Sequence, residues 1–563
     1  MTPITRREFV QGAALAPLGF TSLGAMAQQT ATGPGDRFDI VVAGAGHNSL
    51  VTAAYLAKAG YKVVVLEGRP VIGGGAKTAS ATMVGFKDDM CSTGHTGIQD
   101  NPMLKELSLQ DYGLEYLFPD PFFHMPFADG SSLTMWRDFD RTAAEFGKFS
   151  KKDEAAFRRI YAEYMAFRPV IEANQFLPVG WGKPLNELMA GVPRAGLWQR
   201  RMAMSAWDNI CDNYEDEHTQ NFLVTLALLG PLTDPIYPGT GMSAFGTAAL
   251  MKWGRPCAKG GAGQLTQALA RYIEAHNGVV EVNKPVTRLI IENSKCTGVE
   301  CADGSTFHAD KAVVSTIHIK QLVNMAPRES WGQGFLDGVD TWKEEQGSIF
   351  AANYALKEAP KYGGTTLATA AFFSPNATRV LRNGYDIGVG NANFDEPPML
   401  SECLTVTDPS RAPAGMHTLK LMTCQPYSLK EGPEHWDQIK KQMADAQLKY
   451  LRRFAPNLTD DKILGEFIQS PLDIERMNPA FWHGSVHAGA AGASQSGAMR
   501  PVPGWAQHRM PINGLYQTGS CTAPGGGISG VPGRNAAMVM LKDFGTSIER
   551  VVAKPENKIG ISR

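Results

Sequence analysis

The feature that most constrains the fold is a strand–turn–helix–strand unit near the N-terminus. The apolar run 38–43 leads into a glycine-rich turn, and apolar residues then recur at helical spacing until Gly60. A second apolar run, 62–66, ends at Glu67. Short, fully apolar, β-branched runs are typical of buried parallel strands, and a glycine after a helical pattern marks the end of the helix. The sequence therefore predicts a βαβ unit within an α/β fold.

The residues of the turn predict a nucleotide-binding loop. Gly44 permits a tight turn, and Gly46 lets the backbone approach a pyrophosphate, which the N–H groups and positive end of the next helix would bind. Ser49 stands where a third glycine is usual, and its small side chain still allows the helix to pack closely on the strand. Glu67 can accept hydrogen bonds from ribose hydroxyls. Together these residues predict a bound dinucleotide.

A second glycine run favours FAD over NAD. Gly73, Gly74 and Gly75 follow soon after Glu67 and would let another loop pass close to the cofactor phosphates. This arrangement resembles the glutathione-reductase-type FAD-binding fold, and NAD-only dehydrogenases usually lack it. We therefore expect FAD as the cofactor.

Two later segments have the pattern of further parts of the same domain. Residues 260–315 indicate a glycine turn, a helix, a strand, a small hairpin layer and a last strand, and the backbone around Val286 offers hydrogen bonds to an adenine. Near the C-terminus a strand precedes a glycine-dense loop, which contains Gly519, Gly526 and Gly527, and then a helix. The positive end of that helix would stabilise the negative charge of a reduced flavin.

Three blocks resemble a known family. They are "VVAGAGHNSLVTAAYLAKAGYKVVVLEGRPVIGGGA", "KGGAGQLTQALA" and "GLYQTGSCTAPGGGISGVPGRNAA". In content and order they resemble the phytoene (carotenoid) desaturase-related flavoproteins, within the FAD-linked amine-oxidase superfamily. The resemblance implies a glutathione-reductase-type (Rossmann-like) FAD-binding domain with an inserted α+β substrate domain. It also implies FAD contacts at Gly44, Gly46, Glu67, Gly73, Gly74, Val286, Gly519 and Gly526.

These blocks divide the chain into alternating parts. We expect the FAD-binding domain to come from residues 36–99, 258–320 and 505–563, and the substrate domain from residues 100–257 and 321–504. The intervening segments are rich in aromatic residues and methionine. Such side chains suit an adaptable apolar pocket. We therefore expect an apolar small-molecule substrate.

The N-terminus predicts export. Arg6 and Arg7 precede a mildly apolar stretch that ends in an A-x-A site at residues 25–27. This pattern is typical of a twin-arginine signal peptide, which we place at residues 1–27. Because that route carries folded proteins, it suits a protein that binds its cofactor before export. We expect a periplasmic location and leave peripheral membrane contact open.

Composition excludes some other classes. Lys and Arg number 54 against 55 Asp and Glu, for a net charge of −1, whereas nucleic-acid binding calls for a clustered basic excess. The eight cysteines form no C-x-x-C pair and lie beside no ligand-spaced histidine pair, so we expect no metal site. Homo- or hetero-oligomerisation stays open.

The expected chemistry is removal of an allylic hydride from an isoprenoid such as a carotenoid or terpene. Loss of a neighbouring proton would then give a new C=C bond, and capture of water would give an allylic alcohol. Candidate bases are His95, His483 and His487. Since we find one dinucleotide fingerprint, electrons should leave to a quinone, a cytochrome or O2. The alternatives are a flavin amine oxidase and a non-catalytic FAD-binding subunit of a hetero-oligomer.

Overall fold

The computed structural model describes residues 37–555. The expected signal peptide, residues 1–27, lies outside the described residues. None of the helices between residues 37 and 555 is long and apolar enough to cross a bilayer.

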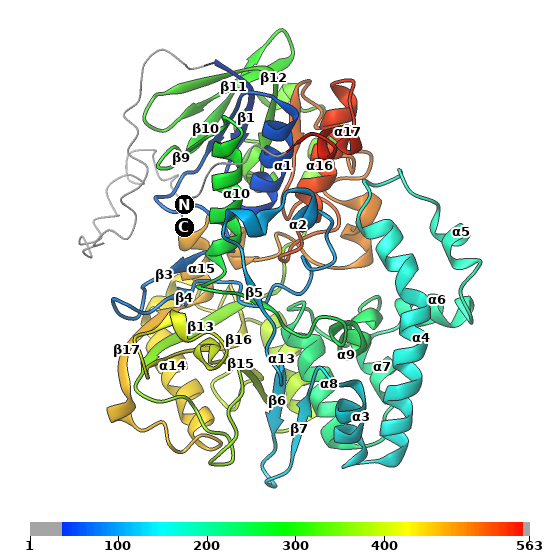
Figure 1. The fold of residues 1–563 in the computed structure, drawn as a ribbon, viewed down its shortest axis with the longest axis vertical. Coiled ribbons are helices and arrows are strands. Elements are labelled where there is room, and N and C mark those ends of the chain that lie inside the picture. Colours follow the sequence, from blue (N-terminus) through cyan, green and yellow to red (C-terminus); the bar gives the residue numbers. More distant parts are fainter. Residues whose placement is uncertain (1–36, 556–563) are drawn as a thin grey trace. The chain divides into compact units, whose positions relative to one another are not determined.

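Three separated parts of the chain build one seven-stranded sheet, which we call the cofactor sheet (Figure 1). β10 (Val286–Glu292) pairs with β11 (Lys295–Cys301), and β11 pairs in turn with the first half of β12, which makes the antiparallel layer of the sheet. The parallel core, from one edge to the other, is β18 (Leu515–Gln517), β12 (Thr306–Ser315), β1 (Arg37–Ala43), β2 (Val63–Leu66) and β9 (Val279–Glu281).

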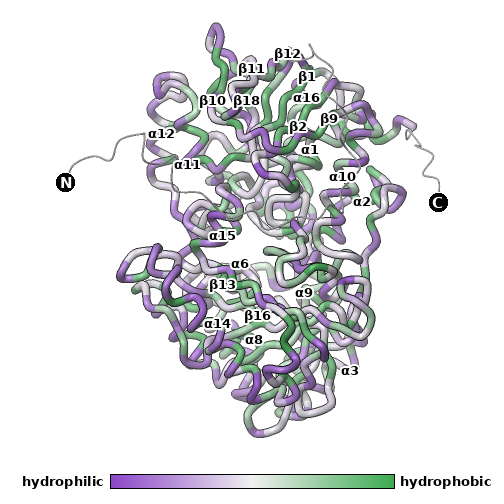
Figure 2. Tube along the Cα trace, turned by 90° about the vertical axis from the view of Figure 1, so that its left-hand side faces the viewer, coloured by the Kyte–Doolittle hydropathy of each residue, from purple (hydrophilic) through white to green (hydrophobic). Residues whose placement is uncertain are grey.

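Alternation along the central strands explains why both faces of the cofactor sheet are covered. Ile40 and Val42 pack with α1 (His47–Ala59), α10 (Gly263–Ala275) and α16 (Val531–Asp543). Val41, between them, points to the opposite core. All three side chains are fully buried, and Figure 2 shows β1 and β2 as hydrophobic segments. A strand buried on both faces needs an unbroken apolar run, which is the predicted pattern.

The register of the parallel strands brings their carboxyl ends to one edge. Ala43 pairs with Leu66 on one side and with Ser315 on the other, and Ser315 pairs with Gln517. The loops that follow β1, β2, β12 and β18 therefore meet, although they are hundreds of residues apart. In open α/β sheets ligands bind at this edge.

The two intervening segments combine in a second sheet, which we call the substrate sheet. Its strands, in spatial order, are β17 (Ile463–Gln469), β13 (Gly347–Leu356), β16 (His417–Pro426), β15 (Met399–Glu402), β14 (Ala370–Phe373), β6 (Phe123–Pro126) and β7 (Ser132–Met135). Helices surround it in Figure 1. They include α3 (Phe139–Gly147), α4 (Lys151–Gln175), α6 (Ala195–Ala203), α8 (Glu217–Leu229), α13 (Ala377–Gly388) and α14 (Trp436–Arg452). The predicted fold, an FAD-binding domain with an inserted α+β substrate domain, is confirmed.

Part of the segment that the sequence assigns to the substrate domain packs on the cofactor sheet instead. Phe335 and Val339 of α12 (Gln333–Asp340) share one apolar core with Val41. The substrate sheet resumes only at β13, so the structural division falls after α12 and not at residue 320. Hydropathy alone does not mark this boundary, because α12 is amphipathic like any surface helix.

Candidate functional site

The first turn holds Gly44 where no other residue fits well. Its φ is +100°, and a Cβ there would lie 2.5 Å from Cγ2 of Thr316. Gly46 differs, because its φ is −72° and the nearest protein atom to an added Cβ, Oγ of Ser49, would be 4.0 Å away. Gly44 is therefore required by the fold, whereas Gly46 keeps open a space in front of the α1 N-terminus.

Ser49 has a defined role in place of the usual glycine. Its hydroxyl donates to the carbonyl oxygens of Gly44, at 2.7 Å, and Gly46, at 2.9 Å, and the residue is fully buried. A separate close contact joins α1 to α16, since a Cβ on Gly533 of α16 would lie 2.1 Å from the carbonyl oxygen of Asn48. Ser49 thus stabilises the turn by hydrogen bonds and does not occupy the space in front of the α1 N-terminus.

Hydrogen bonds join the second glycine loop and Glu67 to the first turn. The Gly73 amide donates to the carbonyl of Ala45 at 2.9 Å. The Glu67 carboxylate accepts from the backbone amides of Ala45, at 3.0 Å, and Arg69, at 2.9 Å. These bonds fix both loops around the N-terminus of α1.

Two cavities meet at this point. The first, of about 590 Å³, is lined by Gly44, Glu67 and Val286. The second, of about 290 Å³, extends toward the substrate sheet and is lined by Gly519 and Gly527, among others. We call them the nucleotide-side and flavin-side cavities. Both are lined by Gly46, Gly74, Thr316, Asn478 and Ala480.

The shared wall fits a dinucleotide whose diphosphate lies at the start of α1. The first N–H groups of a helix have no partner within it and favour an anion. Beside them, the buried Oδ1 of Asn48 bonds no described residue. Of the predicted cofactor residues, Ser49, Gly73 and Gly526 do not line either cavity. They shape the turns behind it, and a Cβ on Gly526 would lie 2.4 Å from Cα of His487.

The far wall of the flavin-side cavity is apolar. Aliphatic and aromatic side chains from both intervening segments meet there: Phe123, Leu226, Leu229, Leu232, Ile349, Phe372, Leu400, Met422, Phe481 and Val486. None of the described residues in the lining is Asp, Glu or Lys. This chamber suits an uncharged, hydrocarbon-like molecule.

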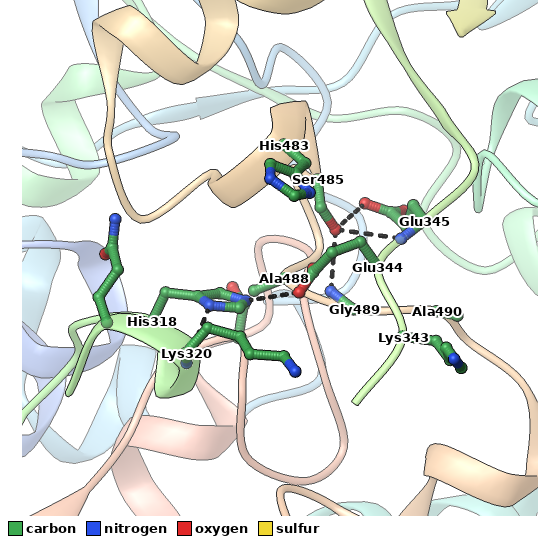
Figure 3. Close-up of polar contacts among 12 residues, drawn as sticks. His318, Lys320, Lys343, Glu344, Glu345, His483, Ser485, Ala488, Gly489 and Ala490 are labelled. Carbon is green, nitrogen blue, oxygen red and sulfur yellow. Dashed lines mark hydrogen bonds and ion pairs between the residues drawn. The ribbon is translucent and has the colours of Figure 1, made fainter. Parts of the chain in front are cut away.

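His487 enters this cavity as part of a buried ion pair. Its Nδ1 lies 2.5 Å from Oε1 of Glu345, and its backbone amide donates to Oε2 at 3.0 Å. The Ser485 hydroxyl donates to the same carboxylate at 2.9 Å (Figure 3). Burial lowers the pKa of His487, but the charge and hydrogen bond of Glu345 outweigh it, so the pKa is raised.

His318 forms a second pair beside the first. Its Nε2 lies 3.4 Å from Oε1 of Glu344, and its Nδ1 accepts from the amide of Lys320 at 3.3 Å, as Figure 3 shows. Burial lowers the pKa of His318, whereas Cys521 and the Glu344 carboxylate raise it; because Nδ1 accepts a hydrogen bond, the ring proton is on Nε2, which faces Glu344. Consecutive carboxylates thus hold two histidines at the cavity wall.

Comparison with known proteins decides the family. The family profile described as "Flavin containing amine oxidoreductase" matches residues 50–541. The chain belongs to this family. The predicted relationship to phytoene desaturase-related flavoproteins is confirmed, and the protein is an FAD-dependent oxidoreductase.

Several relatives of this flavin-containing oxidoreductase match nearly the whole chain. It is 27% identical over 552 residues to pyridine nucleotide-disulfide oxidoreductase domain-containing protein 2 of Rattus norvegicus, covering 90% of this chain and 94% of that protein. It is 26% identical over 546 residues to a limonene dehydrogenase subunit of Castellaniella defragrans, covering 91% of this chain and 95% of that protein. It is 25% identical over 534 residues to a lycopene-forming phytoene desaturase of Pseudescherichia vulneris, covering 90% and 99%.

The fold of the flavoprotein recurs in solved structures. An oxidoreductase from Methanosarcina mazei superposes with a TM-score of 0.56 at 18% identity, over 89% of this chain and 99% of that one. This likeness supports the fold described above.

The three candidate bases of the flavoprotein lie in different surroundings. His487 lines the flavin-side cavity. His95 is fully buried behind the wall, its Nδ1 is 3.0 Å from the Tyr116 hydroxyl, and burial lowers its pKa to about 3. His483 is exposed and stacks on Trp482 and Tyr427. Of the three, His487 alone lines the flavin-side cavity.

Other residues at the site were not singled out from the sequence. Thr316 and His318 follow β12 directly, so their place at the carboxyl edge of the sheet could have suggested them. Glu345 and Arg255 carry no such signal, because each comes from an unpatterned loop that only the tertiary fold brings to the cavity.

Proposed function

We propose that the protein is a dehydrogenase or desaturase that removes an allylic hydride from an apolar isoprenoid, of carotenoid or terpene type. The observation that carries this proposal is the apolar, acid-free wall of the flavin-side cavity. An amine substrate would enter as a cation, and a chamber without a carboxylate in its lining would leave that charge unpaired. The relatives named for limonene and phytoene support the same substrate class.

FAD, when bound, supplies the hydride acceptor. The described residues supply the rest: an apolar wall that positions the substrate and limits water, and a base. We assign the base to His487, since Glu345 occupies its Nδ1 and leaves Nε2 to accept a proton. Proton loss from the carbon next to the one that gave up the hydride would form a new C=C bond. Water capture instead would give an allylic alcohol.

The pH dependence follows from the ion pair. Because the pKa of His487 is raised, the imidazole is neutral and able to accept a proton only above that pKa. We therefore expect the rate to rise with pH through the raised pKa of His487. A rate that falls over this range would contradict a base at this position.

The electron acceptor and the location are part of the proposal. We propose reoxidation by a quinone, a cytochrome or O2 in the periplasm, after export through the twin-arginine signal at residues 1–27. The limonene dehydrogenase relative is named as one subunit of its enzyme, which supports a second polypeptide as partner. Fast reoxidation of the reduced protein by NAD(P)+ alone would contradict this choice of acceptor.

The test is anaerobic bleaching of the flavin by a panel of terpenes, carotenoids and amines. We expect bleaching by members of the first two groups and none by amines. Bleaching by amines, with peroxide released in air, would identify an amine oxidase. A flavin that no compound reduces, and that no acceptor reoxidises after dithionite treatment, would indicate the non-catalytic subunit.

A further inference from the structure

One arginine lies among the apolar side chains of the flavin-side cavity, in addition to the paired histidines His318 and His487. Among the described residues that line it, Arg255 is the sole arginine, and none is a lysine. Its neighbours in the wall include Phe123 and Leu400, and the guanidinium carbon lies 5.6 Å from the centre of the Phe123 ring. A wall built only to exclude water would carry a methionine or leucine here.

One edge of the guanidinium is pinned to the protein. Nη2 donates to Oγ1 of Thr93 at 2.8 Å and to Oε1 of Glu402, and the Thr93 hydroxyl donates to the same carboxylate oxygen at 2.6 Å. The Glu402 side chain, on β15, is only 1% exposed. Gly94 leaves room for the head group, since a Cβ there would lie 2.2 Å from Nη1. The orientation is therefore fixed.

The other edge of the guanidinium faces the cavity. The N–H groups on Nε and Nη1 bond no acceptor within residues 37–555, and 18% of the side chain is exposed. Glu402 balances the positive charge, so the site as a whole is neutral. What remains is a set of donors in a fixed orientation, from which an oxygen in the cavity can accept.

We propose that Arg255 is a specificity-determining residue that binds a hydrogen-bond-accepting oxygen on an otherwise apolar substrate. The substrate would thus be an oxygenated isoprenoid and not a plain hydrocarbon. This inference rests on the proposed function, because it takes the flavin-side cavity as the substrate site. A site with fixed donors rejects an analogue that lacks the acceptor, because its donors are then left unpaired.

The test compares molecules that differ by one oxygen function. The oxidised holoenzyme is titrated with limonene, with its ketone carvone and with the carboxylate perillic acid, and binding is followed by the change in flavin absorbance. A hydrogen bond from a charged donor contributes about 1.5–3 kcal/mol, which corresponds to roughly 10- to 150-fold in affinity. We expect carvone to bind tighter than limonene by this factor. Still tighter binding of perillic acid would identify a carboxylate as the preferred oxygen.

Variants locate the effect. Arg255→Met combined with Glu402→Gln removes the donors without leaving a buried unpaired charge, and we expect it to bind carvone and limonene equally. Arg255→Lys keeps the positive charge but loses the fixed fork, so we expect a partial loss of preference. Arg453→Met is the matched control, because Arg453 lines a different cavity, and the preference should be unchanged.

Two failures are distinguishable. If limonene reduces the flavin but carvone binds no tighter, or if the Met/Gln double variant keeps the preference, the role of Arg255 is refuted and the proposed function stands. If no terpene binds or reduces the flavin while amines do, the proposed function fails and the role of Arg255 fails with it.

Discussion

Gly46→Ala separates the cofactor site from the fold. An alanine at this position has an ordinary φ of −72°, and its Cβ would approach no protein atom more closely than 4.0 Å. The apoprotein should therefore be unaffected, or more stable by up to about 1 kcal/mol through the reduced entropy of the unfolded chain. The methyl group would instead occupy the space in front of the α1 N-terminus.

The expected loss falls on FAD binding. An anion at a helix N-terminus contributes up to about 2 kcal/mol, and one hydrogen bond to a charged phosphate about 1.5–3 kcal/mol. If the methyl group displaces the diphosphate, the helix-terminus interaction and the hydrogen bond are both largely lost. The binding free energy of FAD then weakens by roughly 3–4 kcal/mol, or about two to three orders of magnitude in affinity. FAD titration of the apoprotein, followed by quenching of flavin fluorescence, measures this change.

Two further alanine variants complete the assay. Gly44→Ala places a side chain at φ +100° with its Cβ 2.5 Å from Thr316, so thermal denaturation of the apoprotein should show a loss of stability. Gly334 lies in α12, and no atom is near a Cβ added there. Gly334→Ala should therefore not lower the stability of the protein and should leave its FAD affinity unchanged. Normal FAD affinity in Gly46→Ala would refute the placement of the diphosphate at α1.

Three other variants and a pH series test the structure. Glu345→Gln removes the carboxylate that raises the pKa of His487, so the acid limb of the pH–rate profile should move to lower pH; an unmoved limb would exclude His487 as the titrating group. The pKa of His487 is raised in the folded protein, so the ion pair with Glu345 stabilises the fold below the usual histidine pKa. This stabilisation is lost as the pH rises through the raised pKa of His487. Thermal denaturation at several pH values should show this trend. Gly533→Ala places a Cβ 2.1 Å from the Asn48 carbonyl oxygen and should lower the holoenzyme's thermal midpoint through an overpacking cost of about 1–3 kcal/mol; an unchanged midpoint would show that α16 can shift freely. Arg411→Leu leaves the buried carboxylates of Asp89 and Asp408 without their cation. The free energy of unfolding, measured by urea denaturation, should fall by about 3–5 kcal/mol. An unchanged free energy of unfolding would mean that the carboxylates are protonated in the variant.

The sequence predicted the cofactor sheet well, because its signals are local. The apolar run that became β1, the glycine turn and the helix ending at Gly60 are contiguous, and each follows from short-range sterics and periodicity. The later segment around Val286 also formed the expected hairpin layer. Ser49 stands out in the sequence as a departure from the usual glycine, but its two hydrogen bonds to the turn became visible only in the structure.

The substrate side was predicted only in outline. Nothing in the sequence pairs β6 with β14, which are some 250 residues apart in the chain and lie side by side in the substrate sheet. The predicted domain boundary at residue 320 differs from the structural one after α12 for a related reason. The hydrophobic pattern of an amphipathic helix shows which face is buried, but not which sheet it packs against.

The amino-acid sequence by itself determined the βαβ fingerprint, FAD and the family, because contiguous residues encode them. The tertiary structure alone decided which of the three candidate histidines reaches the cavity. His95, His483 and His487 are equivalent as letters, yet one is buried behind the wall, one is exposed, and one is held at the cavity by Glu345. Burial and ion pairing depend on residues that are distant in the chain, and such contacts exist only after the chain has folded.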